Sequence, residues 1–222
     1  MSGEVRLPWY SQLFRWIARP LFRFLFRTLT RIEILGRENI PASGSYLVTP
    51  NHISIYEPPL LAAFWPRELE IAAAAEVLDR PFQSQIMRLY GTVLVHRNRL
   101  DRSLITALLE RLAEGLPVLI FPEGGRTRHP GLITGNPGAA YLAAKSGVAI
   151  LPVGIEGTYQ LGERMRQLRR PRVRVRIGQP LSFPALDLRS SGWKEALKAR
   201  SEEIMQAIAR LLPIDHRGVY GP

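Results

Sequence analysis

The sequence of 222 residues contains no cysteine. This absence excludes disulfide bonds, thiolate catalysis and cysteine-bound zinc. The four histidines are scattered without metal-ligand spacing, so we expect no metal site. The glycines form neither a Walker loop nor a G-x-G-x-x-G turn that opens a helix, so a nucleotide cradle is not expected.

The sequence also lacks a stretch rich in Pro, Gly and Ser that would divide it into domains. Its length suits one well-buried core, so we expect one domain with a short N-terminal appendage. The N-terminus has no continuous apolar core before a small-residue cleavage site, and we therefore expect no signal peptide.

Acidic residues are scarce: 19 Asp and Glu stand against 30 Lys and Arg, for a net charge of +11. Such a surface attracts anions, which could be nucleic acid, anionic lipid headgroups or phosphorylated small molecules. No helix-turn-helix, zinc or RNA-binding signature supports the first of these, so we expect no nucleic-acid partner.

Residues 1–30 form the appendage, in which aromatic and aliphatic residues surround arginines at every fourth position. The spacing of Arg15, Arg19, Arg23 and Arg27 predicts one slowly drifting helical stripe, and Pro20 predicts either two short helices or one kinked helix. Four charges argue against a membrane span. The pattern favours peripheral attachment to an anionic membrane; the alternative is packing on the domain with the arginines in water.

Residues 31–212 alternate between strand and helix patterns. Strands are predicted at 31–35, 45–49, 91–95, 117–121, 148–155 and 172–177, and helices from about Glu57 and at 81–89, 101–114, 136–147 and 193–212. Residues 69–75 could be either. The order predicts an α/β fold with a mixed, largely parallel sheet flanked by helices, with ligands at the strand C-termini. Residues 213–222 are expected to be an irregular tail.

The stretch from Asn51 to Glu57 follows a buried strand and carries an imidazole and a carboxylate. If a helix begins near Glu57, His52 lies on the loop and Glu57 lies in the first helical turn. The carboxylate can then accept the Nδ1 proton of His52 and leave Nε2 as a base toward a hydroxyl. The alternative is an ordinary surface pair.

A second loop, at 122–128, follows another buried strand. Gly124 and Gly125 allow a close backbone approach to a ligand, Arg126 and Arg128 supply donors for phosphate oxygens, and Glu123 can hold a guanidinium. The alternative is a solvated turn with surface arginines.

These loops belong to four ordered blocks that resemble the motifs of the glycerolipid acyltransferases. His52 with Glu57 resembles the H-x4-D motif, residues 91–97 the second block, residues 121–126 the F-P-E-G-x-R block and residues 150–153 the V-P-V block. The resemblance covers roughly residues 30–180, and the first and third blocks are specific at this separation.

The resemblance implies transfer of an acyl chain from acyl-CoA or acyl carrier protein to a glycerol hydroxyl, without a further cofactor. His52 would act as the base, and Glu57 would orient it. The acceptor's glycerol phosphate would bind at Arg97, Glu123, Gly124 and Arg126. The family also has an N-terminal helical pair that dips into one leaflet, which corresponds to residues 9–30.

Two features depart from the family pattern: Glu57 replaces the usual aspartate, which adds one methylene, and Gly125 and Thr127 stand where threonine and serine are frequent. The sequence thus predicts a lysophosphatidate acyltransferase on the cytoplasmic face of the cell membrane, with backbone amides near Gly124 and Gly125 as guessed oxyanion donors. Rival hypotheses are another lysophospholipid or aminolipid acceptor, or a catalytically silent membrane-binding homologue.

Overall fold

The computed structural model describes residues 7–74, 81–95, 102–127 and 129–221, and their strands form one seven-stranded sheet. The strands are β1 (Arg31–Leu35), β2 (Tyr46–Pro50), β3 (Glu70–Ala74), β4 (Val93–Val95), β5 (Val118–Leu119), β6 (Ala149–Glu156) and β7 (Arg172–Ile177). Their order is β1-β7-β6-β2-β5-β3-β4. Neighbours are parallel except β6 and β7. The mixed, largely parallel sheet predicted from the sequence is confirmed.

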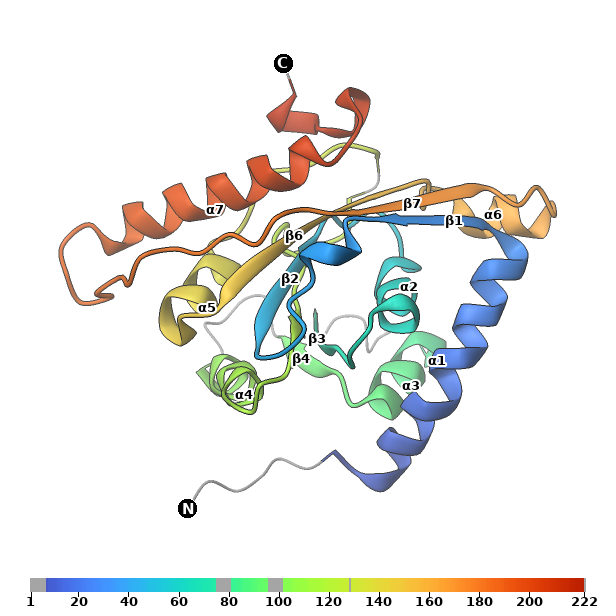
Figure 1. Ribbon diagram of the computed structural model, residues 1–222, viewed down its shortest axis with the longest axis horizontal. Helices are drawn as coiled ribbons and strands as arrows, with labels where there is room; N and C mark the ends of the chain where they lie inside the picture. Colours follow the sequence, from blue (N-terminus) through green and yellow to red (C-terminus); the bar gives the residue numbers. More distant parts are fainter. Residues whose placement is uncertain (1–6, 75–80, 96–101, 128, 222) are drawn as a thin grey trace.

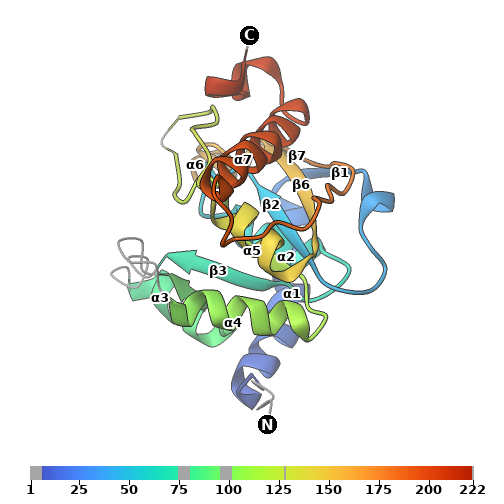
Figure 2. The ribbon, with the colours of Figure 1, turned by 90° about the vertical axis from the view of Figure 1, so that its left-hand side faces the viewer.

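Helices cover both faces of this sheet, as the two ribbon views show (Figures 1 and 2). They are α1 (Trp9–Leu29), α2 (Glu57–Phe64), α3 (Pro81–Tyr90), α4 (Arg102–Ala113), α5 (Gly138–Ser146), α6 (Leu161–Arg166) and α7 (Trp193–Arg210). Side chains alternate along each strand, so the sheet divides the core in two. Tyr46 and Val48 of β2 pack with α2 in one cluster, whereas Leu47 packs with α4, α5 and α7 in the other.

The sequence-based element assignments hold with local exceptions. Residues 69–75, left open between strand and helix, contain strand β3. The helix predicted at 136–147 begins at Gly138 with Pro137 as its N-cap, and the Asn136 side chain donates to the carbonyl of Glu123. At the end of the helix predicted at 193–212, Leu211 is half-buried and Leu212 is buried. The tail contains two short 3₁₀ turns, η3 (Ile214–His216) and η4 (Gly218–Tyr220).

The N-terminal segment is one helix with Pro20 inside it, and its arginine stripe faces the domain. Arg15 is buried, Arg19 donates to the carbonyls of Trp65 and Pro66, and Arg23 donates to the carbonyl of Ala63. The alternative in which the segment packs with its arginines in water is therefore wrong for these three residues. Backbone carbonyls at the end of α2 supply acceptors that the sequence pattern alone does not reveal.

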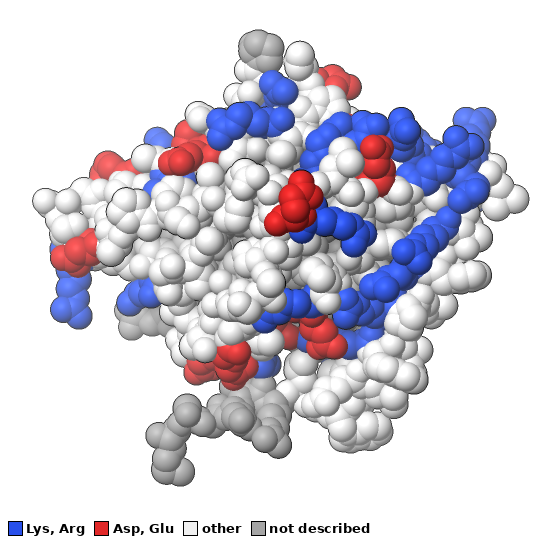
Figure 3. Space-filling model, in the orientation of Figure 1, with Lys and Arg blue, Asp and Glu red and all other residues white. Residues whose placement is uncertain are grey.

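The surface of α1 beside this stripe is apolar and exposed. Its large exposed side chains are Trp9, Tyr10, Leu13, Trp16, Ile17, Leu21, Phe24 and Leu25. In Figure 3 a diagonal band of basic side chains runs along α1 beside a pale surface without charge. Within the described residues, no helix is both long enough and apolar enough to span a bilayer.

Candidate active site

Strands β2, β5 and β6 are parallel neighbours, so the loops after them meet at one edge of the sheet. Asn51 links two of these loops. Its Nδ2 donates to the carbonyl of Ile155 at 2.9 Å, and the N–H of Ile155 donates back to Asn51 Oδ1 at 2.7 Å. This buried pair continues the β2–β6 ladder by one side chain and fixes the start of the loop that carries His52.

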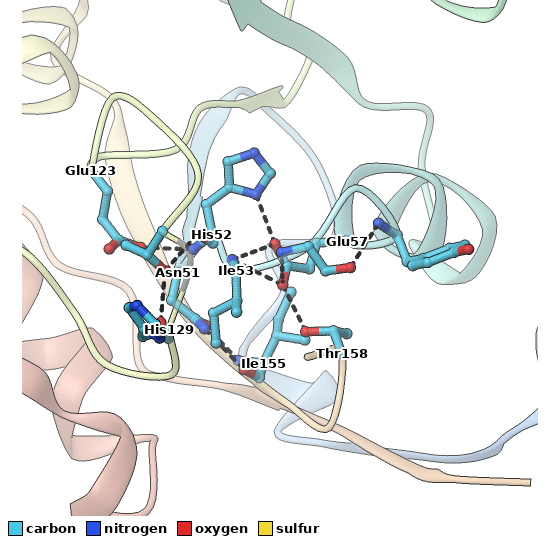
Figure 4. A network of polar contacts seen from close by, with 11 residues as sticks. Asn51, His52, Ile53, Glu57, Glu123, His129, Ile155 and Thr158 are labelled. Carbon is cyan, nitrogen blue, oxygen red and sulfur yellow. Dashed lines mark hydrogen bonds and ion pairs between the residues drawn. The ribbon is translucent and has the colours of Figure 1, made fainter. Parts of the chain in front are cut away.

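His52 and Glu57 lie in direct contact, as the sequence predicts. The distance between His52 Nδ1 and Glu57 Oε2 is 2.7 Å (Figure 4). Glu57 is the first residue of α2 and is fully buried, whereas 18% of the His52 side chain is exposed. A carboxylate only accepts, so Nδ1 carries the proton and Nε2 keeps a free lone pair that points away from Glu57.

The carboxylate of Glu57 accepts hydrogen bonds from several donors. Besides His52, it accepts hydrogen bonds from the N–H groups of Ile53 and Ser54, at 3.0 to 3.1 Å. Thr158 Oγ1 donates to Glu57 Oε1 at 2.7 Å. These donors saturate the carboxylate and hold Oε2 against the imidazole. The glutamate that replaces the usual aspartate is thus held in place by backbone and side-chain donors.

Thr158 is a member of this network that the motif analysis missed. It is fully buried and lies 101 residues from Glu57, on the turn after β6. The preceding Gly157 has φ +85°, and a side chain there would collide with the carbonyl of Arg172. In the sequence, a Gly-Thr pair directly after a buried strand could have indicated this site residue. Its contact with Glu57 depends on the order of the strands in the sheet.

Phe121 and Thr127 position the rest of His52. The imidazole stacks on the Phe121 ring, with centroids 3.9 Å apart and 26° between the planes. The N–H of Thr127 donates to the His52 carbonyl at 2.9 Å. The loop after β5 therefore holds both the ring and the backbone of the histidine.

Glu123 contacts the backbone of His52 rather than presenting a free carboxylate to a ligand. Its Oε1 accepts from the His52 N–H at 2.7 Å, and its Oε2 accepts from the Ile133 N–H at 3.2 Å. Burial raises the pKa of Glu123 to about 7, although the two N–H donors act in the opposite direction. In this geometry Glu123 positions His52, which differs from its expected place at the acceptor phosphate.

Gly124 is favoured by its left-handed backbone conformation. It has φ +68°, and a side chain there would collide with Asn136, whose Nδ2 donates to the Glu123 carbonyl at 3.1 Å. The N–H of Gly124 donates to the Phe121 carbonyl, so this amide is already occupied. That contact contradicts the guess that the Gly124 amide is an oxyanion donor.

Of the three predicted arginines, the structure describes only Arg126. It is exposed on the loop that contacts His52, between Gly125 and Thr127. Arg97 and Arg128 lie outside the described residues. Within the described part of the chain, no group of three or more His, Cys, Asp or Glu side chains could hold a metal ion.

Comparison with known proteins shows which family the chain resembles. Residues 31–156 match the family model described as Acyltransferase. A 1-acyl-sn-glycerol-3-phosphate acyltransferase of Borreliella burgdorferi is 30% identical over 58% of this chain and 52% of its own length. The chloroplastic enzyme of that name, LPAT1, from Arabidopsis thaliana is 28% identical over 82% of this chain and 52% of its own length.

Two further comparisons bear on acceptor and fold. A lyso-ornithine lipid O-acyltransferase of Pseudomonas aeruginosa is 37% identical over 47% of this chain and 40% of its own length. The crystal structure of the 1-acyl-sn-glycerophosphate acyltransferase PlsC from Thermotoga maritima superposes with a TM-score of 0.58 at 24% identity, over 87% of this chain and 79% of that one. The latter likeness shows the fold.

The chain spans about half the length of the curated relatives it matches. The matched region nevertheless contains every residue of the site from Asn51 to Glu123, and it covers more than half of the chain. The chain therefore belongs to the acyltransferase family, as its four sequence blocks predicted.

Proposed function

We propose that this protein transfers a fatty acyl chain from an acyl thioester to the free hydroxyl of 1-acylglycerol-3-phosphate, which gives phosphatidate. The observation that carries the proposal is the 2.7 Å contact between His52 Nδ1 and the buried Glu57 carboxylate. It leaves Nε2 of His52 as a base. The names of two relatives support the acceptor.

In the proposed reaction, His52 Nε2 takes the proton of the acceptor hydroxyl while that oxygen attacks the thioester carbonyl. The tetrahedral intermediate collapses, the carbon–sulfur bond breaks, and the proton passes from His52 to the leaving thiolate. Glu57 stabilises the imidazolium that exists between the two transfers. The proposal needs no group besides acyl-CoA or acyl carrier protein as donor.

The acceptor phosphate is proposed to lie beside the loop after β5. Arg126 is exposed there, and the same loop binds the His52 backbone through Thr127. A phosphate held by Arg126 would therefore lie near the base. Arg97 remains part of the proposal on the basis of the family resemblance.

The test is acyl transfer to lysophosphatidate in mixed micelles, from acyl-CoA and separately from acyl carrier protein, with thiol release and phosphatidate both measured. His52→Ala and Glu57→Gln should each lower kcat by about a hundredfold or more. Thermal melting of each variant controls for folding. Silence of the folded, membrane-bound wild-type protein with both donors would contradict the proposed acceptor.

A second acceptor is favoured by one observation, namely the 37% identity to a lyso-ornithine lipid O-acyltransferase. Lyso-ornithine lipid and lysophosphatidate should therefore be compared in one competition assay. A larger kcat/KM for lyso-ornithine lipid would transfer the assignment to that acceptor and leave the dyad mechanism unchanged.

We further propose that the protein attaches peripherally to the cytoplasmic face of the cell membrane through α1. The helix presents a row of exposed apolar side chains, including Trp16 at 75% and Phe24 at 65% exposure, while its arginines contact the domain. Lipid-embedded aromatic residues are favoured at the headgroup boundary. This arrangement would hold the active site next to its lipid acceptor.

A further inference from the structure

An open groove of about 400 Å³ lies between the C-terminal end of α1 and the edge strand β1. Four arginines line it: Arg27 from α1, Arg31 from β1, Arg37 from η1 (Arg37–Asn39) and Arg170 from the segment before β7. Apolar side chains of β1 and α2 complete the lining. The groove is thus a basic depression built from three separate parts of the chain, namely residues 27–37, Phe64 and Arg170.

The positive charge of this groove is not neutralised within the described part of the protein. None of the four arginines there forms an ion pair, and all four are exposed. Glu33, the carboxylate of β1, is bound to Arg174 of β7 at 2.8 Å. Arg170 Nη2 instead donates to the carbonyl of Arg27 at 3.0 Å, which fixes one guanidinium at the groove.

The pKa of Arg23, a neighbour of the groove on α1, also reflects the positive charge that gathers there. The pKa of Arg23 lies below its ordinary value, first because of desolvation and then because of the like charges of Arg19, Arg27 and Arg37. Mutual repulsion of this kind is relieved when an anion binds. The groove is therefore electrostatically suited to a phosphate.

The groove is also continuous with the apolar face of α1. Arg27 lines the groove and lies on the same helix end as the exposed Phe24 and Leu25. If that face enters the hydrocarbon boundary, the groove arginines lie at headgroup depth. Binding of a soluble anion does not require the groove to lie beside the apolar face of α1, whereas binding of a membrane lipid does.

We propose that the groove lined by Arg27, Arg31, Arg37 and Arg170 binds the phosphodiester of an anionic phospholipid at the membrane surface. The bound lipid is neither donor nor acceptor, because the groove shares no lining residue with the site around His52. It would fix the rotation of the domain on the bilayer. This inference rests on the proposed attachment through α1.

The test measures binding to vesicles of phosphatidylcholine alone and of phosphatidylcholine with phosphatidylglycerol. The groove variant is Arg31→Gln with Arg37→Gln, since neither side chain donates a hydrogen bond within the described part of the protein. The matched control is Arg189→Gln with Arg210→Gln, two exposed arginines on the loop before α7 and on α7 itself. Helix α7 packs on the other face of the sheet from α1 (Figure 1).

The groove variant should lose about fivefold of its preference for phosphatidylglycerol per arginine, and about twenty-fivefold in total. The control variant should keep the preference of the wild type within about twofold. All three proteins should bind phosphatidylcholine vesicles equally, because that binding reports α1 alone. Equal losses in both variants, or no loss in the groove variant, would overturn the proposal.

Two outcomes distinguish this inference from the proposed attachment through α1 and from binding of a free phosphate. If the wild type binds no vesicles, the attachment through α1 fails and the lipid site fails with it. A second arm titrates inorganic phosphate and glycerol 3-phosphate without vesicles. Loss of that binding in the groove variant, with vesicle preference unchanged, would assign the groove to a free phosphate and overturn the lipid assignment.

Discussion

At the scale of single residues, hydrogen bonds hold both the ring and the backbone of His52 at the candidate site. Glu57 fixes the ring through Nδ1, and Glu123 and Thr127 fix the backbone N–H and carbonyl. Because reaction rates are sensitive to small displacements of a base, we expect loss of these contacts to lower turnover more than substrate affinity.

Thr158→Val should lower kcat by about tenfold and leave KM nearly unchanged, because one donor to the buried Glu57 carboxylate is lost while the shape is kept. Thr158→Ser keeps the hydroxyl and should retain most of the activity. Steady-state kinetics of the pair measures this. Equal kcat for the valine and serine variants would show that Thr158 acts through packing alone.

Glu123 should make stability depend on pH. Its pKa is about 7 in the folded protein, against an ordinary value near 4.5, so the folded state binds more protons between these values. The free energy of unfolding therefore gains a contribution that is present below about pH 4.5 and is lost as the pH rises through about 7. Urea unfolding across this range should show a flatter profile for Glu123→Gln than for the wild type.

At the scale of elements, α1 is joined to the sheet by a buried ion pair. Arg15 Nη1 lies 2.5 Å from Glu70 Oε1 on β3, and Arg15 Nε donates to the carbonyl of Tyr90 at the end of α3. Both charged side chains are at most 3% exposed. Helix α1 is therefore a structural part of the domain.

Arg15→Met should destabilise the protein by about 3 kcal/mol, because it leaves the Glu70 carboxylate buried and without its main partner. The double variant with Glu70→Met should recover much of the loss, since Arg111 retains Glu114 at 3.3 Å. Chemical unfolding of the wild type, of the single variants Arg15→Met and Glu70→Met, and of the double variant completes the cycle. Additive losses would mean that the pair contributes nothing as a pair.

At the scale of the whole molecule, charge and apolar surface meet along α1. Trp16→Gln with Phe24→Gln should weaken binding to phosphatidylcholine vesicles by about tenfold or more, because two large exposed side chains no longer enter the bilayer. Sedimentation with vesicles measures this. The matched control is Ile214→Gln with Val219→Gln, each 65% exposed in the C-terminal turns, which should bind like the wild type.

The sequence by itself determined most of the fold and the central pair of the site. Strand and helix periodicities placed the elements, and the five-residue spacing from His52 to Glu57 is short enough for local structure to bring the two together once α2 begins at Glu57. Such features depend on contacts near in sequence, which patterns can reveal.

Only the tertiary structure decided the rest. Thr158 reaches Glu57 across 101 residues because β6 lies beside β2, and Glu123 reaches His52 across 71 because β5 lies on its other side. The direction of the α1 arginines was decided by the carbonyls of α2 that they contact. In each case the partner is set by which strands and helices become neighbours, and that depends on packing of the whole sheet.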